Sequence, residues 1–575
     1  MSTPLLVQKT AKNGLRILCE RVPTAPVVAL QAWVGVGSAD ETPREAGLAH
    51  VHEHMLFKGT AHRGVGEIAR EVEAAGGEIN AWTSFDETVY HITMSSRYFK
   101  TGLDVLSDAI QHSSFDAEEL AREKEVVLEE IRRGDDQPSR RLSQRIFSSS
   151  FKKHPYGLPV IGTKKSVSSF GRKHVVDFYK KWYIPNNLTF VVSGDVDPEA
   201  AALAVEKIFS KSRAGKIRRP ARADEPLSRG PRFFAEVADA GDSYAALAFP
   251  AAALLHPDAP ALDVLAEILG GGEASRLFER VQAEKGLVST VYAHAYTPKD
   301  PGLFLVGANP FVGKEREALA AVAKELFEIR EHGVTDEELS RAKLNLEAES
   351  VYLRETVQGR ARKWGFSLLL TGDASFEERY LSAIRSLTRE DILRVAKEYL
   401  RPERIAAGLI QPGTAKGKQK TAEEKKIAGD LEALFRGEGS KSKTAARRPA
   451  KEEGRPSLHT LPNGMRVVIE KNTSVPVVAL KAVWLGGSRF ETAPDAGLYH
   501  FLAEMLPRGA AERSATQIRH EAEEIAGSAT GVAGRNSTGV DVQCLSRFWE
   551  RGLSLLADLT LRPNFPEDEI EKTRA

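Results

Sequence analysis

Apolar positions in the first 200 residues switch between the spacing of strands and the spacing of helices. Residues 27–36 (VVALQAWVGV) are almost all apolar, which predicts a buried strand. Residues 78–82 and 88–95 alternate between apolar and polar side chains, as paired strands do. Apolar residues three or four positions apart predict helices at 47–57, 65–75, 98–111 and 117–134. The order lacks a regular βαβ rhythm, so we expect an α+β fold with helices packed on one face of a mostly antiparallel mixed sheet.

The chain also contains an internal repeat with a constant offset of 450 residues. The stretch NGLR at 13–16 returns as NGMR at 463–466, and VVAL at 27–30 returns as VVAL at 477–480. Such a register over about 100 residues indicates one unit followed by the beginning of a second copy. The second copy stops at Ala575 within a helical pattern, without a helix-end signal. We therefore expect a fragment of a longer protein or a shortened gene product.

The repeat and the local composition predict four segments. Residues 1–215 form the first domain, and residues 216–412 form a second domain of similar build. Residues 413–457 are rich in Lys, Glu, Ala, Gly and Ser and are expected to be a charged hinge linker, in which residues 422–436 could form one amphipathic helix. Residues 458–575 are the start of the repeated domain. The prediction is therefore of repeated domains joined by a solvated segment.

Composition excludes several classes of protein. The 575 residues carry 80 Lys and Arg against 79 Asp and Glu, so bulk basic charge cannot drive nucleic-acid binding. Two cysteines are too few for a disulfide framework or a Cys-based zinc module. No apolar run approaches the roughly 20 residues of a membrane span, and the first residues do not have the pattern of a secretory signal. We expect a cytoplasmic protein that binds neither nucleic acid nor membranes.

The residues that can carry chemistry lie in the stretch AGLAHVHEHMLFKGT. It contains His50-x-x-Glu53-His54, and positions i and i+4 of a helix lie one turn apart on the same face. Two imidazoles in that arrangement can bind one zinc ion, and Glu53 can act as general base toward a metal-bound water. This is the metalloprotease motif with the glutamate position inverted. The alternative is a polar surface helix, and His52, on another face, is expected not to be a ligand.

A catalytic zinc site needs a third protein ligand and an open position for water. The best source is the predicted helix at 117–134, in which Glu123 and Glu130 are two turns apart on a shared face. A run of glutamates on a helix is usually a solvated face, and the spacing alone does not choose between these carboxylates.

Longer motifs narrow the choice by resemblance. The motifs that carry the resemblance are HxxEH followed by GT, then GGEINAWTSFDETVY, EKEVVLEEI, YIPNNLTFVVSGDVDPE and LGGGEASRLFERV. In these motifs the chain resembles the M16 family of inverzincin metallopeptidases, which includes pitrilysin, insulin-degrading enzyme and the mitochondrial processing peptidase. The resemblance implies the LuxS/MPP-like metallohydrolase fold and one Zn²⁺ per chain. It implies His50, His54 and Glu130 as the ligands, with Glu123 behind them.

The resemblance also implies the reaction and the substrate contacts. Members of the family hydrolyse internal peptide bonds, so we expect a zinc-dependent endopeptidase acting on peptides or small unfolded proteins, with Glu53 as the base. The stretch Asn80-Ala81-Trp82-Thr83 matches the family's NAxT edge strand, which binds the substrate backbone by strand addition. Asn80, Ala81 and Thr83 are therefore the expected substrate-binding residues. Asn80 could alternatively be only a turn residue after Gly76-Gly77.

The second copy departs from this pattern. His500 is retained, whereas Ala503 stands opposite Glu53 and Glu504 opposite His54; Thr530 and Thr573 replace Asn80 and Glu123. Tandem members of the family have one active and one degenerate half that close around a chamber, and here 413–457 would be their hinge.

A second departure concerns an Arg and a Tyr that family members use near the zinc. Gln282 and Ser289 occupy those positions here. The resemblance therefore leaves two alternatives to an active endopeptidase: a non-catalytic scaffold subunit, or a fragment that binds zinc but is inactive without a missing C-terminal domain. The expected partners are a peptide substrate and either a separate C-terminal half or further copies of the chain.

Overall fold

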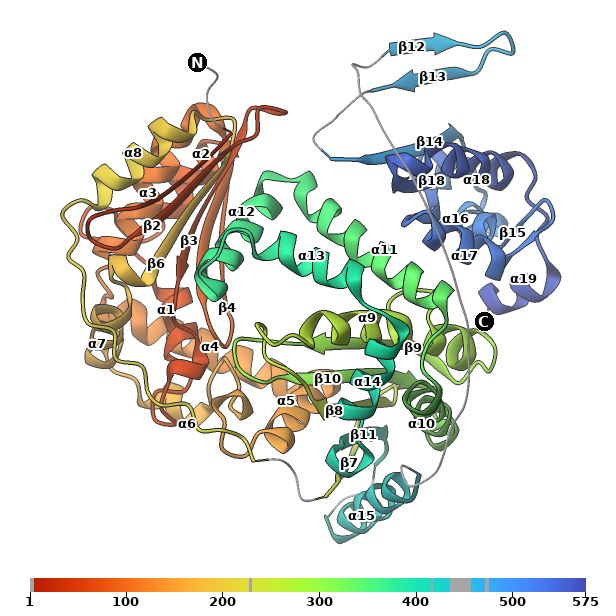
Figure 1. The fold of residues 1–575 in the computed structure, drawn as a ribbon, viewed down its shortest axis with the longest axis horizontal. Coiled ribbons are helices and arrows are strands. Elements are labelled where there is room, and N and C mark those ends of the chain that lie inside the picture. The colour runs from red at the N-terminus through yellow and green to blue at the C-terminus, as the bar shows by residue number, and fades with distance from the viewer. Residues whose placement is uncertain (1–4, 227–229, 415–416, 435–456, 471–474, 575) are drawn as a thin grey trace.

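The computed structural model describes residues 5–226, 230–414, 417–434, 457–470 and 475–574 (Figure 1). Within them the chain forms a six-stranded, a five-stranded and a three-stranded sheet, with helices packed against each, and two small two-stranded sheets. The predicted α+β class is therefore confirmed. The boundaries of the four predicted segments stay predictions.

The first sheet has the strand order β1-β2-β6-β3-β5-β4. Only β2 and β6 pair in parallel, and the other neighbours are antiparallel. The edge strand β4 therefore has one pairing partner, β5, among the described strands. The strands are β1 (Leu6–Thr10), β2 (Arg16–Arg21), β3 (Val27–Val34), β4 (Glu78–Thr83), β5 (Thr88–Ser95) and β6 (Leu188–Gly194).

Helices of the first unit, residues 5–226, cover one face of this sheet. On that face Val28, Leu30 and the other even-numbered residues of β3 enter the main core. These helices are α1 (Leu48–Met55), α2 (Glu67–Ala74), α3 (Phe99–His112), α4 (Ala117–Asp136), α6 (Lys164–Ser169), α7 (Arg172–Trp182) and α8 (Pro198–Phe209). Helix α5 (Pro138–Ser150) instead packs on the five-stranded sheet through Leu142 and Ile146. The opposite face of β3 is also buried, because α12 (Val357–Phe366) of the second unit packs on it around Trp33. This explains why β3 is buried on both faces, including Gln31, whose side chain donates to the Gln358 carbonyl of α12.

The second unit comprises residues 230–414 and 417–434, and its sheet has the strand order β7-β11-β8-β10-β9. Its strands are β7 (Arg232–Ala238), β8 (Tyr244–Pro250), β9 (Val288–Tyr296), β10 (Leu303–Pro310) and β11 (Ala406–Pro412), and its helices besides α12 are α9 (Ala259–Gly270), α10 (Glu315–His332), α11 (Asp336–Tyr352), α13 (Phe376–Ser386), α14 (Arg389–Tyr399) and α15 (Gly417–Leu434). Helix α15 lies within the predicted linker, yet it packs on β7 and buries Leu431. The structure thus has a helix where one was predicted at 422–436, while 415–416 and 435–456 lie outside the described residues and the hinge stays a prediction.

The third unit comprises residues 457–470 and 475–574 and repeats part of the first unit. Strands β14 (Val477–Leu485), β17 (Ser528–Ala533) and β18 (Ser537–Leu545) correspond to β3, β4 and β5, and β12 (Ser457–Thr460) and β13 (Arg466–Ile469) form a separate hairpin. The remaining elements are α16 (Leu498–Met505), β15 (Gly509–Ala510), β16 (Arg513–Ser514), α17 (Ala515–Glu524), α18 (Trp549–Leu561) and α19 (Glu567–Arg574).

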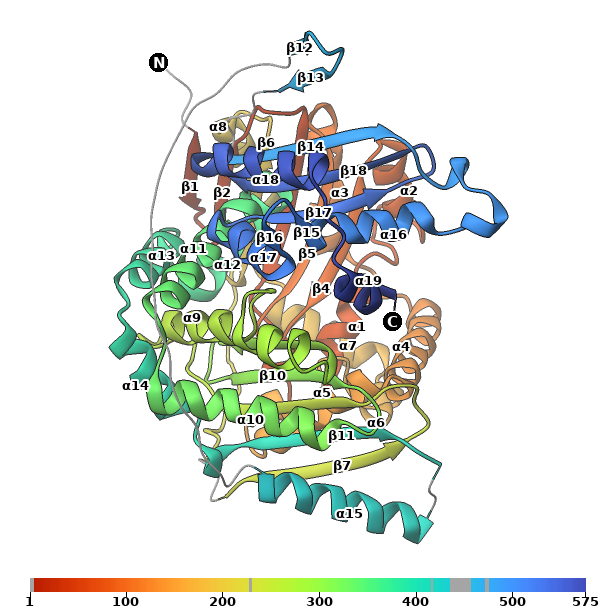
Figure 2. The same cartoon turned by 90° about the vertical axis from the view of Figure 1, so that its right-hand side faces the viewer.

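Helices α11 to α13 lie between the first sheet and the third unit in Figure 1, and Figure 2 views the molecule from the third unit's side. The third unit is fixed to the second by the Tyr352 hydroxyl, which donates to the Ala526 carbonyl at 2.6 Å, and by the Ala274 amide, which donates to the Glu523 carboxylate at 2.7 Å. In the described part of the chain, no helix combines the length and the apolarity needed to cross a bilayer.

Candidate metal centre

Helix α1 carries the HxxEH residues, and its first turn is held by a buried carboxylate. Glu41 accepts hydrogen bonds from the Gly47 amide at 2.8 Å and the Ala49 amide at 2.6 Å, two groups that a helix start leaves without intrahelical partners. Gly47 has a φ of 99°, a left-handed conformation that favours glycine. Leu48, Val51 and Met55 of α1 are buried in the core. These contacts fix the helix that presents His50, Glu53 and His54.

The structure brings His50, His54 and Glu130 together. The Nε2 atoms of His50 and His54 lie 3.6 Å and 3.9 Å from Oε2 of Glu130, which belongs to α4. One ligand atom from each of the three residues lies within 4.8 Å of the others. Two imidazole nitrogens and a carboxylate oxygen thus converge on one point.

Glu123 orients the imidazole of His54. It lies seven residues, about two turns, before Glu130 on α4, with only 7% of its surface exposed. Its Oε2 is 3.2 Å from Nδ1 of His54, and its Oε1 is 2.7 Å from Nζ of Lys58. A carboxylate at Nδ1 favours the tautomer whose Nε2 has a free lone pair, directed here toward Glu130.

His50 and Glu130 are fixed differently. Burial, together with the neighbouring His54, lowers the pKa of His50 to about 4, so its imidazole is neutral at pH 7. Its buried Nδ1 has no hydrogen-bond partner among the described residues. Arg140, on α5, donates from Nη2 to Oε1 of Glu130 at 3.2 Å and leaves Oε2 facing the histidines.

Glu53 lies beside this cluster and contacts the end of β4. Burial raises the pKa of Glu53, and the adjacent Thr83 and His54 offset part of that shift. A carboxylate with a raised pKa holds a proton more readily than an ordinary surface glutamate. That property suits a group that accepts and then returns a proton.

The residues predicted to bind substrate lie on β4, the edge of the first sheet. Asn80 is exposed, and its Oδ1 accepts from the amide of Ala81 at 2.8 Å. Ala81 packs against the core, and Thr83 ends the strand next to Glu53. Asn80 is therefore part of a strand in this structure, not a turn residue, and the edge runs toward the candidate metal ligands.

Other residues of the motif analysis lie apart from the cluster. His52 is buried, with its ring nitrogens 2.8 Å from the carbonyl oxygens of Leu48 and Val175. In the second copy, His500 and Glu504 are exposed on α16. Among the described residues, the groups whose side chains could hold a metal include neither of them.

Gln282 and Ser289, which stand at the family's Arg and Tyr positions, lie next to each other. The Gln282 side chain donates from Nε2 to the carbonyl of Ser289 at 3.0 Å. Both belong to the second unit: Gln282 lies in the helical segment Phe278–Ala283, and Ser289 lies at the start of β9.

Two residues at the cluster were not predicted from the sequence. Lys58 follows the HxxEH motif in the stretch FKGT, and Arg140 begins a new helix ten residues after Glu130. Neither position has a spacing signal, because their contacts depend on how α4 and α5 fold back toward α1.

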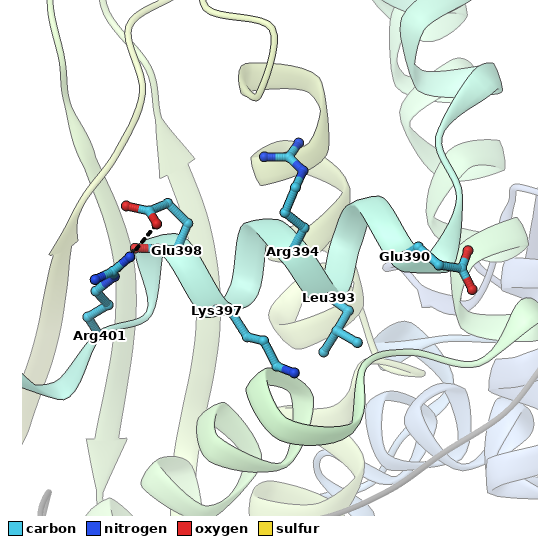
Figure 3. Close-up of a pocket in the computed structure, with 6 residues that line it drawn as sticks. All are labelled: Glu390, Leu393, Arg394, Lys397, Glu398 and Arg401. Carbon is cyan, nitrogen blue, oxygen red and sulfur yellow. Dashed lines mark hydrogen bonds and ion pairs between the residues drawn. The ribbon is translucent and has the colours of Figure 1, made fainter.

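A separate surface depression of about 560 Å³ lies along α14 (Figure 3). Its lining residues are Glu390, Leu393, Arg394, Lys397, Glu398 and Arg401, none of them a predicted site residue. Arg394 also pairs with Asp258, and Arg401 with Glu398, so charged partners already occupy this surface.

The donor set fits a zinc ion. Neutral His50, His54 held at Nδ1 by a carboxylate, and the free oxygen of Glu130 make a His₂Glu set, which occurs in catalytic zinc sites. The unpartnered Nδ1 of His50 does not conflict with this, because Nε2 is the atom that faces the other donors.

Comparison with protein families matches most of the chain. A model described as Insulinase (Peptidase family M16) matches residues 16–164 and again 466–575. A model described as Peptidase M16 inactive domain matches residues 169–346.

Curated relatives and solved structures agree with these matches. The chain is 29% identical to a Bacillus subtilis protein named "Uncharacterized zinc protease YmxG" over 71% of this chain and 98% of that protein. It is 30% identical to a Rickettsia felis protein named "Uncharacterized zinc protease" over 71% and 97%.

Among solved structures, a protease from Helicobacter pylori matches 71% of this chain and all of that chain, with 28% identity and a TM-score of 0.67. The periplasmic protease PqqL from Escherichia coli matches 99% of this chain and 67% of its own, with 19% identity and a TM-score of 0.63, and shares the fold. The repeated match, the curated relatives and the inverted HxxEH helix with its distant glutamate together show that this chain belongs to peptidase family M16.

Proposed function

We propose that this chain is a zinc-dependent endopeptidase that hydrolyses internal bonds of peptides or small unfolded proteins. The observation that carries the proposal is the convergence of His50, His54 and Glu130 on one point with Glu53 beside them. The printed names of the relatives, which call them zinc proteases, support the same reaction class.

Each residue of the cluster has a role in this proposal. His50, His54 and Glu130 hold one zinc ion, which when bound supplies a Lewis acid for the scissile carbonyl and lowers the pKa of water. Glu53 removes the proton from the attacking water and passes it to the leaving amine. Glu123 and Arg140 act through His54 and Glu130, which they orient.

The edge of β4 supplies the substrate contacts. A peptide added alongside this strand would complete hydrogen bonds that Asn80 to Thr83 do not make with β5. Thr83 lies at the end of β4 that adjoins Glu53, so a peptide bound along the strand would pass the catalytic carboxylate.

Replacing Glu53 with Gln tests the proposal. We expect bound zinc to stay at the wild-type level while hydrolysis falls by roughly 10²- to 10⁴-fold, the usual contribution of general acid–base catalysis. The substrate is a quenched fluorescent peptide with an acetylated N-terminus and an amidated C-terminus, which an exopeptidase cannot trim. Glu125→Gln, an exposed carboxylate on α4, is the matched control and should be silent. Unchanged hydrolysis in Glu53→Gln would exclude Glu53 as the base.

A second candidate is a chain that binds zinc without hydrolysing peptides by itself. The contact between Gln282 and Ser289 favours it, because these residues replace the expected Arg and Tyr. It predicts stoichiometric zinc and no wild-type turnover, with activity appearing only when a separately expressed C-terminal half is added. Turnover by the wild-type chain alone, abolished by Glu53→Gln, decides against it.

A further inference from the structure

A second group of metal-ligating side chains is formed by the end of α3 and the loop that follows α1. Asp108 and His112 are one turn apart near the end of α3, and His62 belongs to the loop between α1 and α2. Nδ1 of His62 and Nδ1 of His112 lie 2.7 Å and 3.0 Å from Oδ1 of Asp108. The three donors lie within 4.8 Å of one another.

The group is held in place by backbone contacts. Thr60 forms an isolated bridge with Ser113, and the Ala61 amide donates to the His112 carbonyl at 3.0 Å. These contacts attach the loop that carries His62 to the last turn of α3. The two imidazole rings therefore lie edge to face beside Asp108, with ring centroids 5.0 Å apart and planes at 86°.

The charges around the group favour a cation. Burial opposes ionisation of Asp108, but hydrogen bonds from Thr60, His62, Arg63 and His112 outweigh it and lower its pKa to about 2. Arg63 binds Oδ2 of Asp108 at 2.8 Å and also pairs with Asp104 and Glu71. The carboxylates of Glu71, Asp104 and Asp108 thus surround the guanidinium of Arg63. The other oxygen of Asp108, Oδ1, contacts His62 and His112.

The second copy shows which part of this cluster is structural. Asp558 and Arg513 stand at the positions of Asp108 and Arg63, and they form the same ion pair, with Glu521 in the place of Glu71. The histidines are not repeated: Glu512 replaces His62, and Arg562 replaces His112 and pairs with Asp558. The Arg–Asp pair is therefore common to both copies, and the two imidazoles are an addition to the first.

We propose that His62, Asp108 and His112 form a second site for a divalent transition-metal ion, separate from the His50, His54 and Glu130 cluster. Two imidazoles and one carboxylate are the ligands that Zn²⁺, Cu²⁺ and Ni²⁺ prefer over Mg²⁺ or Ca²⁺. On binding, each neutral imidazole moves its proton from Nδ1 to Nε2 and donates the Nδ1 lone pair in its place. His62 and His112 are both exposed, so the ion has access from solvent and a water can complete its coordination.

Zinc content under metal-buffered equilibrium dialysis tests the proposal on the whole chain. We expect two equivalents of Zn²⁺ in the wild type and one in His62→Ala/His112→Ala. His50→Ala/His54→Ala should also retain one equivalent, and the fourfold variant none. The control His174→Ala/His256→Ala removes the same number of exposed histidines elsewhere and should keep two equivalents.

The wild type, the two double variants at the candidate ligands and the fourfold variant distinguish the two sites from each other. They also distinguish the loss of a metal site from misfolding. The equivalent that remains in His62→Ala/His112→Ala reports that its first domain is folded. Competition with Mg²⁺ at a hundredfold excess should leave both equivalents in place. Equal zinc content in the wild type and in His62→Ala/His112→Ala would overturn the proposal. A single wild-type equivalent lost only in His50→Ala/His54→Ala would overturn it as well and would show that Asp108 merely anchors the two imidazoles.

Discussion

Replacing Glu123 with Ala tests how far zinc affinity depends on the orientation of His54. Glu123 is 7% exposed and touches both Nδ1 of His54 and Nζ of Lys58, so water can replace its contacts only in part. A hydrogen bond to a charged group contributes about 1.5–3 kcal/mol. Loss of such a bond behind a ligand histidine weakens metal binding by about 10- to 100-fold, or roughly 1.4–2.8 kcal/mol. The two figures agree, so we expect a loss within that range.

The assay is competition for zinc against a chelator of known affinity at fixed pH. Glu125→Ala is the control, because Glu125 is exposed on the same helix and should leave the affinity unchanged. Urea unfolding of the zinc-free proteins separates lost affinity from lost fold. Zinc affinity of Glu123→Ala within twofold of the wild type, with an intact fold, would refute the view that Glu123 positions His54.

Three further predictions concern the scaffold. Arg276, 3% exposed, binds both oxygens of Glu338 at 2.6 Å and 2.8 Å, so Arg276→Ala should cost about 3–5 kcal/mol in urea unfolding by leaving a buried carboxylate unpaired. Burial alone would raise the pKa of Glu338, but Arg276 outweighs burial and lowers that pKa. The stabilisation by the pair should therefore be present above the ordinary carboxyl range and be lost as acid titrates Glu338. Arg276→Ala should instead gain stability on mild acidification, as urea midpoints across pH would show. A Cβ on Gly365 would lie 2.0 Å from Nε1 of Trp33, so Gly365→Ala should cost about 1–3 kcal/mol and lower the Tm, unlike Gly429→Ala, where no atom lies within 4 Å.

Local patterns predicted the elements around the site because each depends on nearby residues. The apolar run of β3, the alternation of β4 and β5, and the spacing of His50 and His54 all survive in the structure within a few residues. The choice of Glu130 over Glu123 could not come from spacing, since both lie on the inner side of α4. Which of the two carboxylates reaches the histidines depends on where α4 crosses α1, and that is a tertiary property. The family resemblance supplied the choice of Glu130.

Other features depended on contacts between distant segments. The polar helix α12 covers the second face of β3 through Trp33, although more than 300 residues separate them. An amphipathic helix was predicted at 422–436 inside the charged segment, but not the contacts of α15, which packs through Leu431 and accepts a hydrogen bond from the Val237 amide on Glu424 at 3.1 Å. Composition describes how a segment behaves alone, and here burial by a neighbouring sheet edge overrides it.

The two copies of the first domain separate what the fold needs from what the chemistry needs. Glu491 accepts from the amides of Gly497 and Tyr499 at the start of α16, just as Glu41 holds the start of α1. The second copy thus keeps the carboxylate that begins the helix while it loses the functional one, because Ala503 stands where Glu53 does and is buried without disrupting the helix.

This scaffold therefore forms without the counterparts of Glu53 and His54. Nothing in the packing of α1 requires Glu53, so a small or neutral residue in its place should leave the unfolding free energy near that of the wild type. A fall in hydrolysis on changing Glu53 would then report proton transfer and not a damaged domain. A Glu53→Ala variant that lost several kcal/mol of stability would contradict this reasoning, because the copy built around Ala503 forms the same helix on the same strand pair.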